Sequence, residues 1–184
     1  LLDQIAIWLA AGIIEPSHAE ALNAAVAHPE WFDLSDRNMV LFGAASEAGP
    51  LTWLAKWKAN IIAVDLPNSR VWNKILSTVQ QGNATLYAPS TTQLAADTPL
   101  DILTEQLGAN LLTQTPEIAQ WLAQKPETLD LAAIAYLDGE KHVRVARAMD
   151  AIMQYVSEHK ADSSLMFMCT PTDVYAVPEE VISA

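Results

Sequence analysis

The sequence predicts an α/β fold in which a parallel β-sheet is covered by helices on both faces. Short continuous apolar runs, typical of strands buried on both faces, alternate along the chain with segments whose apolar residues recur at helical spacing. Parallel neighbours in a sheet need crossover connections of about a dozen or more residues, and the helical segments provide them. The chain of 184 residues is also long enough for one domain with a sizeable core.

The composition and charge of the chain exclude several classes of protein. Hydrophobic residues make up 51% of the chain and charged residues 17%, which indicates extensive burial. The formal net charge of -12 would repel a nucleic-acid backbone, and charged residues interrupt every apolar stretch before it reaches the length of a membrane span. The single cysteine, Cys169, excludes an internal disulfide, and the four histidines lack the spacing of a zinc site. We therefore expect a soluble, cytoplasmic protein with no metal, no nucleic-acid partner and no membrane partner.

Residues 1–36 are predicted to form an N-terminal helical extension of two short helices. Apolar residues at helical spacing are interrupted at Gly12 and Pro16, which separates the two helices. Ser17 is a candidate N-cap of the second helix, and residues 28–31 are expected to end it.

A strand–helix–strand unit follows the extension. The apolar run 39–42 is interpreted as a buried strand that stops at Gly43, and the run 61–64 as a second strand that ends before Asp65. Pro50 suits the first turn of the helix between them, because the amide hydrogen that proline lacks has no partner at that position.

Further elements alternate along the rest of the chain. The pattern predicts helices over 71–79, 100–112, 116–123 and 142–156, strands over 84–87, 131–136 and 164–168, a polar loop over 89–99, and a last helix starting near Pro178. Residues 37–184 are thus expected to form a single domain.

A loop of mostly small residues follows the first strand. It consists of Gly43, Ala44, Ala45, Ser46, Glu47, Ala48 and Gly49. In a nucleotide-binding crossover this loop turns sharply and lets a pyrophosphate approach the backbone, where the start of the next helix supplies free amides and a partial positive charge. We therefore interpret the loop as a candidate cofactor-binding segment.

An acidic residue follows the second strand. Asp65 lies after Gly43 at close to the roughly 20-residue offset at which a carboxylate accepts hydrogen bonds from the adenosine ribose. A carboxylate at this place would repel a 2′-phosphate, which favours NAD over NADP, while Arg70 nearby in the sequence keeps NADP as the second choice. Asp65 and its neighbour Leu66 are therefore candidate cofactor contacts.

These features resemble the short-chain dehydrogenase/reductase family over roughly residues 38–173. The first loop of that family reads Gly-xxx-Gly-x-Gly, and this chain has Gly43 and Gly49 in the outer positions with Glu47 in the middle one. The resemblance implies a three-layer Rossmann-like domain that binds NAD(P).

The resemblance also implies roles for two later segments. Asp138 and Gly139 stand after the fourth predicted strand, where the family has its Asn-Ala-Gly, and they are candidate cofactor contacts. Asp-Gly is equally an ordinary turn pair, and both interpretations remain open. The segment after the fifth strand stands where the family has its catalytic serine, and the catalytic candidates there are Thr170, Thr172, Asp173 and Tyr175. The alternative is that these side chains cap the next turn through local backbone hydrogen bonds.

The function predicted from these residues is that of an NAD-linked oxidoreductase with an unidentified small-molecule substrate. The Tyr-xxx-Lys pair of the family is absent. Two alternatives stay open: an S-adenosylmethionine-dependent methyltransferase, which uses the same strand, loop and acidic residue, and a non-catalytic binding or assembly module. Tryptophans that pack helices or lie at a contact between copies leave a homo-oligomer as an expectation. Lys141 is interpreted as a surface charge.

Overall fold

The computed structural model describes residues 1–168 and residue 179, and within them the chain forms a five-stranded parallel sheet. The strands are β1 (Asn38–Phe42), β2 (Asn60–Val64), β3 (Thr85–Tyr87), β4 (Asp130–Ala133) and β5 (Ser164–Phe167). The helices are α1 (Leu2–Ala10), α2 (Pro16–Ala27), the 3-10 helix η1 (Pro29–Phe32), α3 (Leu51–Leu54), α4 (Ser69–Gln80), α5 (Leu100–Gln106), α6 (Thr115–Ala123) and α7 (Gly139–His159).

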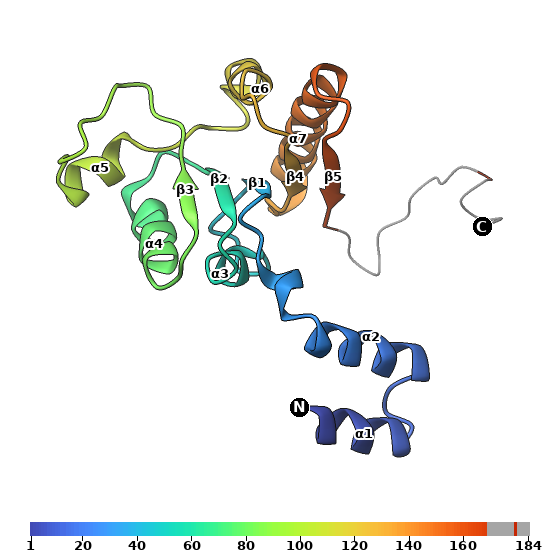
Figure 1. Cartoon of the computed structure of the whole chain (residues 1–184). Helices are drawn as coiled ribbons and strands as arrows, with labels where there is room; N and C mark the ends of the chain where they lie inside the picture. Colours follow the sequence, from blue (N-terminus) through green and yellow to red (C-terminus); the bar gives the residue numbers. More distant parts are fainter. Residues whose placement is uncertain (169–178, 180–184) are drawn as a thin grey trace.

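The order of the strands in the sheet is β3-β2-β1-β4-β5 (Figure 1). β1 pairs in parallel with β2 on one side and with β4 on the other, so that Val40 lies opposite Ile62 and Leu131. The chain therefore builds the sheet outward from β1 in one direction and later crosses back to add β4 and β5. In open parallel sheets this reversal leaves a crevice at the carboxyl ends of the central strands, where ligands bind.

Alternate side chains of β1 enter two different cores. Val40 and Phe42 belong to the core under α6 and α7, whereas Leu41 belongs to the core under α3 and α4, together with Trp72. The three strand residues are fully buried, and burying each such side chain contributes roughly 1.5–3 kcal/mol. Helices thus cover both faces of the sheet, which confirms the predicted α/β, three-layer Rossmann-like architecture.

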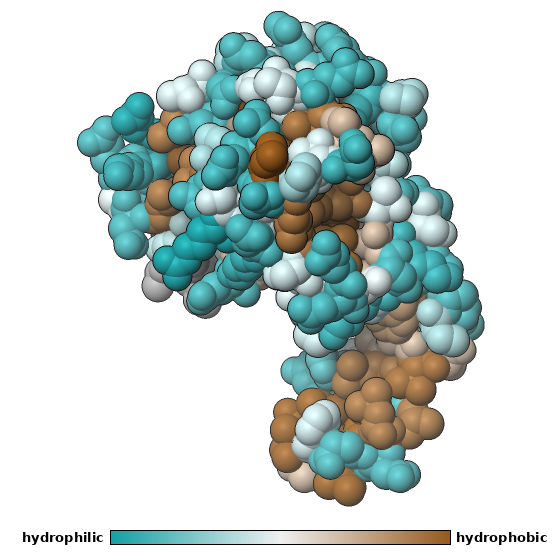
Figure 2. Space-filling model, turned by 90° about the vertical axis from the view of Figure 1, so that its left-hand side faces the viewer, coloured by the Kyte–Doolittle hydropathy of each residue, from teal (hydrophilic) through white to brown (hydrophobic). Residues whose placement is uncertain are grey.

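The N-terminal hairpin lies away from the sheet (Figure 1). α1 and α2 pack on each other, and Ile5 and Ala19 are buried in the hairpin. Many of the other apolar side chains of α1 are exposed, among them Leu2 and Ile7, and Figure 2 shows this surface in brown at the lower end of the molecule. The two helices predicted within residues 1–36 are present.

The predicted cap of the second helix is wrong. α2 begins at Pro16, with Glu15 in the N-cap position and no side chain accepting from the free amides, so Ser17 lies inside the helix. Proline suits the first helical position because its fixed φ is already helical and its missing amide hydrogen has no partner there. At the other end, α2 stops at Ala27 and the chain continues as one turn of 3-10 helix.

Two predicted elements are longer than those in the structure. The helix expected over 100–112 ends at Gln106, because Gly108 has a φ of +118° and a Cβ there would lie 2.7 Å from Pro67 Cα. The strand expected over 131–136 ends at Ala133, since its neighbour β1 ends as the chain turns at Gly43.

The helix expected after Pro50 is a single turn, α3. After it the chain continues with i→i+3 hydrogen bonds, in which Lys56 N donates to Trp53 O and Trp57 N donates to Leu54 O. The helix expected near Pro178 lies outside the described residues. In the described part of the chain, no helix has the length and apolar character needed to cross a membrane.

Candidate functional site

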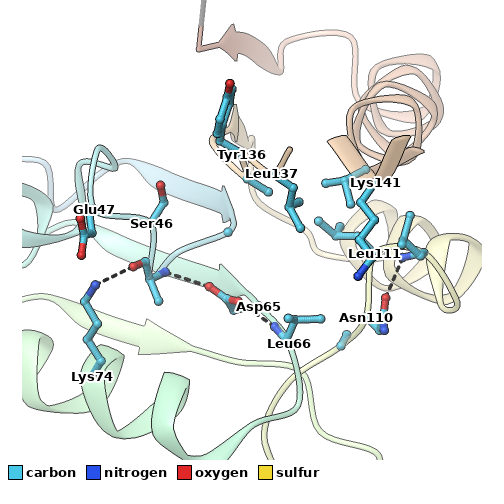
Figure 3. Close-up of a pocket in the computed structure, with 16 residues that line it drawn as sticks. Ser46, Glu47, Asp65, Leu66, Lys74, Asn110, Leu111, Tyr136, Leu137 and Lys141 are labelled. Atoms are coloured by element: carbon cyan, nitrogen blue, oxygen red, sulfur yellow. Dashed lines mark hydrogen bonds between the residues drawn. The ribbon is translucent and has the colours of Figure 1, made fainter. Parts of the chain in front are cut away.

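A cavity of about 630 Å³ opens at the carboxyl ends of β1, β2 and β4, where the strand order reverses (Figure 3). Its volume lies within the roughly 300–1,000 Å³ of typical small-molecule sites. The segments that follow these strands supply most of its lining, and the rest comes from α4, the start of α7 and the loop before α6. The lining consists of Gly43, Ala45, Ser46, Glu47, Asp65, Leu66, Lys74, Ala109, Asn110, Leu111, Leu112, Ala135, Tyr136, Leu137, Lys141 and Val145.

Gly43 lets the backbone after β1 approach the backbone after β4. Its φ is +82°, in the left-handed region that favours glycine, and a Cβ at this position would lie 2.7 Å from Ala135 Cα and 2.8 Å from Ala135 Cβ. The Gly43 amide is held by Val64 O at 2.8 Å, which ties the turn to the end of β2. Glycine is therefore needed here for the two loops to meet at the floor of the crevice.

The loop after Gly43 consists of consecutive turns. Ser46 N donates to Gly43 O at 3.0 Å, and Gly49 N donates to Ser46 O at 3.1 Å. Within the described residues, the amides of Ala44, Glu47 and Ala48 donate to no protein acceptor. The helix that follows, α3, is only one turn long, so these loop amides add to the free donors that the sequence predicts at the start of that helix.

Asp65 links the end of β2 to this loop. Its Oδ2 accepts a hydrogen bond from Ala45 N at 2.8 Å, and its Oδ1 accepts one from Leu66 N at 2.8 Å. A carboxylate has about four acceptor sites on its two oxygens, so two of them stay available to a ligand. The two backbone donors hold the carboxylate in one orientation at the wall of the cavity (Figure 3).

The charged side chains that line the cavity are Glu47, Asp65, Lys74 and Lys141. They balance to zero formal charge, whereas the whole chain carries a net charge of -12. Lys74 Nζ donates to Ala45 O at 2.8 Å and so supports the same loop residue that Asp65 holds through its amide. An anion in the crevice is therefore repelled less than an anion at the surface of the rest of this acidic protein.

The structure brings together about half of the residues predicted for cofactor binding. Gly43, Ala45, Ser46, Glu47, Asp65 and Leu66 line the main cavity. Ala44 and Gly49 line an adjoining smaller cavity of about 220 Å³. Ala48 lines neither of these two cavities, and the same holds for Asp138 and Gly139, which are exposed and lead into α7.

The predicted catalytic segment lies outside the described residues. This applies to Thr170, Thr172, Asp173 and Tyr175 alike. Among the residues that the structure does describe, no group of three or more His, Cys, Asp or Glu side chains could hold a metal ion.

Sequence reasoning missed four polar residues of the lining: Lys74, Asn110, Tyr136 and Lys141. Asn110 falls inside the helix predicted over 100–112, although Gly108 near the end of that range is a typical stop signal. Ala109 N donates to Asp65 O at 2.9 Å, which carries Asn110 to the carboxyl end of β2. No local pattern distinguishes Lys74 or Lys141 from other lysines on exposed helix faces.

Comparisons of the chain with models of protein families, with curated proteins and with solved structures find no match.

Proposed function

We propose that this chain is the NAD-binding domain of an oxidoreductase similar to the short-chain dehydrogenases, and that NAD binds in the main cavity. The observation that supports this most directly is the fixed carboxylate of Asp65 at the wall of a cavity whose floor requires Gly43. The cavity lies at the strand-order reversal, where parallel sheets of this kind bind nucleotides.

Asp65 suits the adenosine ribose. Two vicinal hydroxyls can donate to the two acceptor sites that Ala45 N and Leu66 N leave unused. The carboxylate loses little rotational entropy when a ligand binds, because the backbone donors already hold it in place.

The loop after β1 suits a diphosphate. The free amide of Glu47, which lines the main cavity, and that of Ala44, which lines the adjoining smaller cavity, can donate to phosphate oxygens. Glu47 is exposed, so its carboxylate can turn into solvent and away from a bound phosphate.

NAD is preferred over NADP in this proposal. A 2′-phosphate would lie against the Asp65 carboxylate and repel it. Arg70, the nearest arginine in the sequence, is exposed at the start of α4 and does not line the cavity. The proposed chemistry, hydride transfer to or from a small substrate beside Thr170 to Tyr175, rests on the family resemblance alone.

Calorimetric titration of the full chain with NAD, NADP and S-adenosylmethionine tests the proposal. We expect NAD to bind with a Kd below the millimolar range and NADP to bind at least tenfold more weakly. The Asp65→Asn variant, with its fold checked by circular dichroism, should lose at least tenfold in NAD affinity, which is about 1.4 kcal/mol. Asp162→Asn, an exposed acidic residue in the turn before β5, is the matched control and should bind like the wild type.

Two results would overturn the proposal. One is the absence of NAD binding by the folded wild-type chain at millimolar concentration. The other is tight binding of S-adenosylmethionine in place of NAD, which would support the methyltransferase alternative.

A further inference from the structure

Lys141 faces the cavity from the opposite wall to Asp65. It lies in the first turn of α7, and Figure 3 shows its side chain extending from this helix into the cavity. Val145, one helical turn after it, lines the same cavity, as does Leu137 in the segment before α7. Val145 is buried and Lys141 is exposed, so this face of α7 turns toward the crevice, and Lys141 lies where the face meets solvent.

The Lys141 ammonium group has no hydrogen-bonding or ionic partner among residues 1–168 and 179. The other cations nearby are occupied. Lys74 donates to the loop carbonyl of Ala45, and on α7 itself Arg144 pairs with Glu140 and Arg147 with Asp150. Within the described residues, Lys141 is therefore a cation that reaches the cavity and has no protein partner of its own.

The walls beside Lys141 are largely apolar. Leu111, Leu112, Leu137 and Val145 line this side of the cavity, whereas the carboxylates of Glu47 and Asp65 come from the loops after β1 and β2. An ion pair formed next to apolar walls is screened less than one in open water. An anionic group of a ligand is therefore the partner that this position lacks.

We infer that Lys141 binds a phosphate group of the ligand, and that the cavity accepts phosphorylated ribonucleosides in preference to nucleosides. This inference rests on the proposed function in one respect, because it assigns the sugar to Asp65 and the phosphates to the region between the β1 loop and α7. The ligand class that satisfies both walls is a ribonucleoside diphosphate or its ester, such as the ADP-ribose half of NAD.

Calorimetric titration of the full chain with ADP-ribose, adenosine and inorganic pyrophosphate tests the inference. Replacing Lys141 by Gln should weaken ADP-ribose and pyrophosphate binding about tenfold or more, because a charge-assisted contact is lost. Adenosine binding should stay unchanged, and Lys141→Arg should restore most of the affinity for ADP-ribose. Arg144→Gln removes the same charge from the same helix outside the cavity and should have no effect.

The outcomes separate this inference from the proposed function. If Lys141→Gln binds ADP-ribose like the wild type while Asp65→Asn does not, the role of Lys141 is wrong and the nucleotide site stands. If pyrophosphate binds in a Lys141-dependent way but no nucleotide binds, the phosphate contact of Lys141 stands, whereas the ribonucleotide ligand class and the NAD proposal both fail. If the wild type binds none of the three ligands, both are overturned.

Discussion

Replacing Gly43 by Ala tests whether the close approach of two loops builds the floor of the crevice. The added Cβ would lie 2.7 Å from Ala135 Cα, 2.8 Å from Ala135 Cβ and 2.9 Å from Ala135 N, closer than real Cβ atoms come. Two of these three neighbours are backbone atoms, so the contact cannot be relieved by a side-chain rotation. The φ of +82° adds strain of its own.

The expected loss of stability has two parts. Placing a non-glycine residue in the left-handed region costs roughly 1–2 kcal/mol, and overpacking costs about 1–3 kcal/mol more. We therefore expect Gly43→Ala to lower the free energy of unfolding by about 2–5 kcal/mol, which corresponds to a fall in Tm of roughly 4–20 °C in a domain of this size.

Gly139 provides a matched control in the same domain. Its φ is +60°, and a Cβ built on it meets nothing within 4 Å. Gly139→Ala should therefore lose only the conformational part, about 1–2 kcal/mol. Urea unfolding followed by tryptophan fluorescence, with the buried Trp72 among the reporters, gives both values. Equal losses for the two variants would refute the idea that Gly43 is required by the contact with Ala135.

Two further predictions concern regions away from the cavity. Lys58 and Ser35 hold the pKa of Asp33 down at about 2 through hydrogen bonds, the one from Lys58 being the largest cause. Because this pKa is depressed below the unfolded value of about 3.9, the stabilising contribution of the ionised Asp33 is present above pH 4 and is lost as the pH falls through 2. Lys58→Met should move the pKa of Asp33, measured by NMR titration, back toward the ordinary value. Deleting residues 1–27 should leave the circular dichroism of the sheet domain and its urea midpoint unchanged, since α1 and α2 lie away from the sheet (Figure 1); loss of cooperative unfolding would contradict this.

The central strands could be predicted because their signal is local. β1 and β2 are short apolar runs closed by Gly43 and Asp65, and a run of this kind is stable as a strand only where both faces are covered. The order of the strands, β3-β2-β1-β4-β5, comes from the structure and not from this local signal. The general position of a ligand site at the carboxyl ends of the central strands is a consequence of that order.

The end of α5 could not be predicted in the same way, because a tertiary contact decides it. Leu100 to Leu112 keeps helical spacing beyond the point where the helix stops. The chain leaves the helix because Gly108 must pass close to Pro67 and Trp72, with room for no Cβ between them. Asn110 reaches the cavity only through this departure, so its place in the lining depends on packing that no single-sequence pattern encodes.

The spacing between Gly43 and Asp65 has more than one physical explanation. The offset of Asp65 from Gly43 predicts a ribose ligand, yet the same carboxylate also accepts from Ala45 N and so fixes the loop that would cradle the phosphates. An acid at this offset therefore has a role in the fold even without a ligand, so the offset alone does not distinguish a nucleotide-binding loop from a loop that the carboxylate only stabilises. Stronger support comes from two unused acceptor sites on Asp65 together with Lys141 across the same cavity, which has no partner in the part of the chain that the structure describes. A ligand with hydroxyls at one end and phosphates at the other satisfies both walls at once, whereas a neutral ligand brings no negative charge to Lys141.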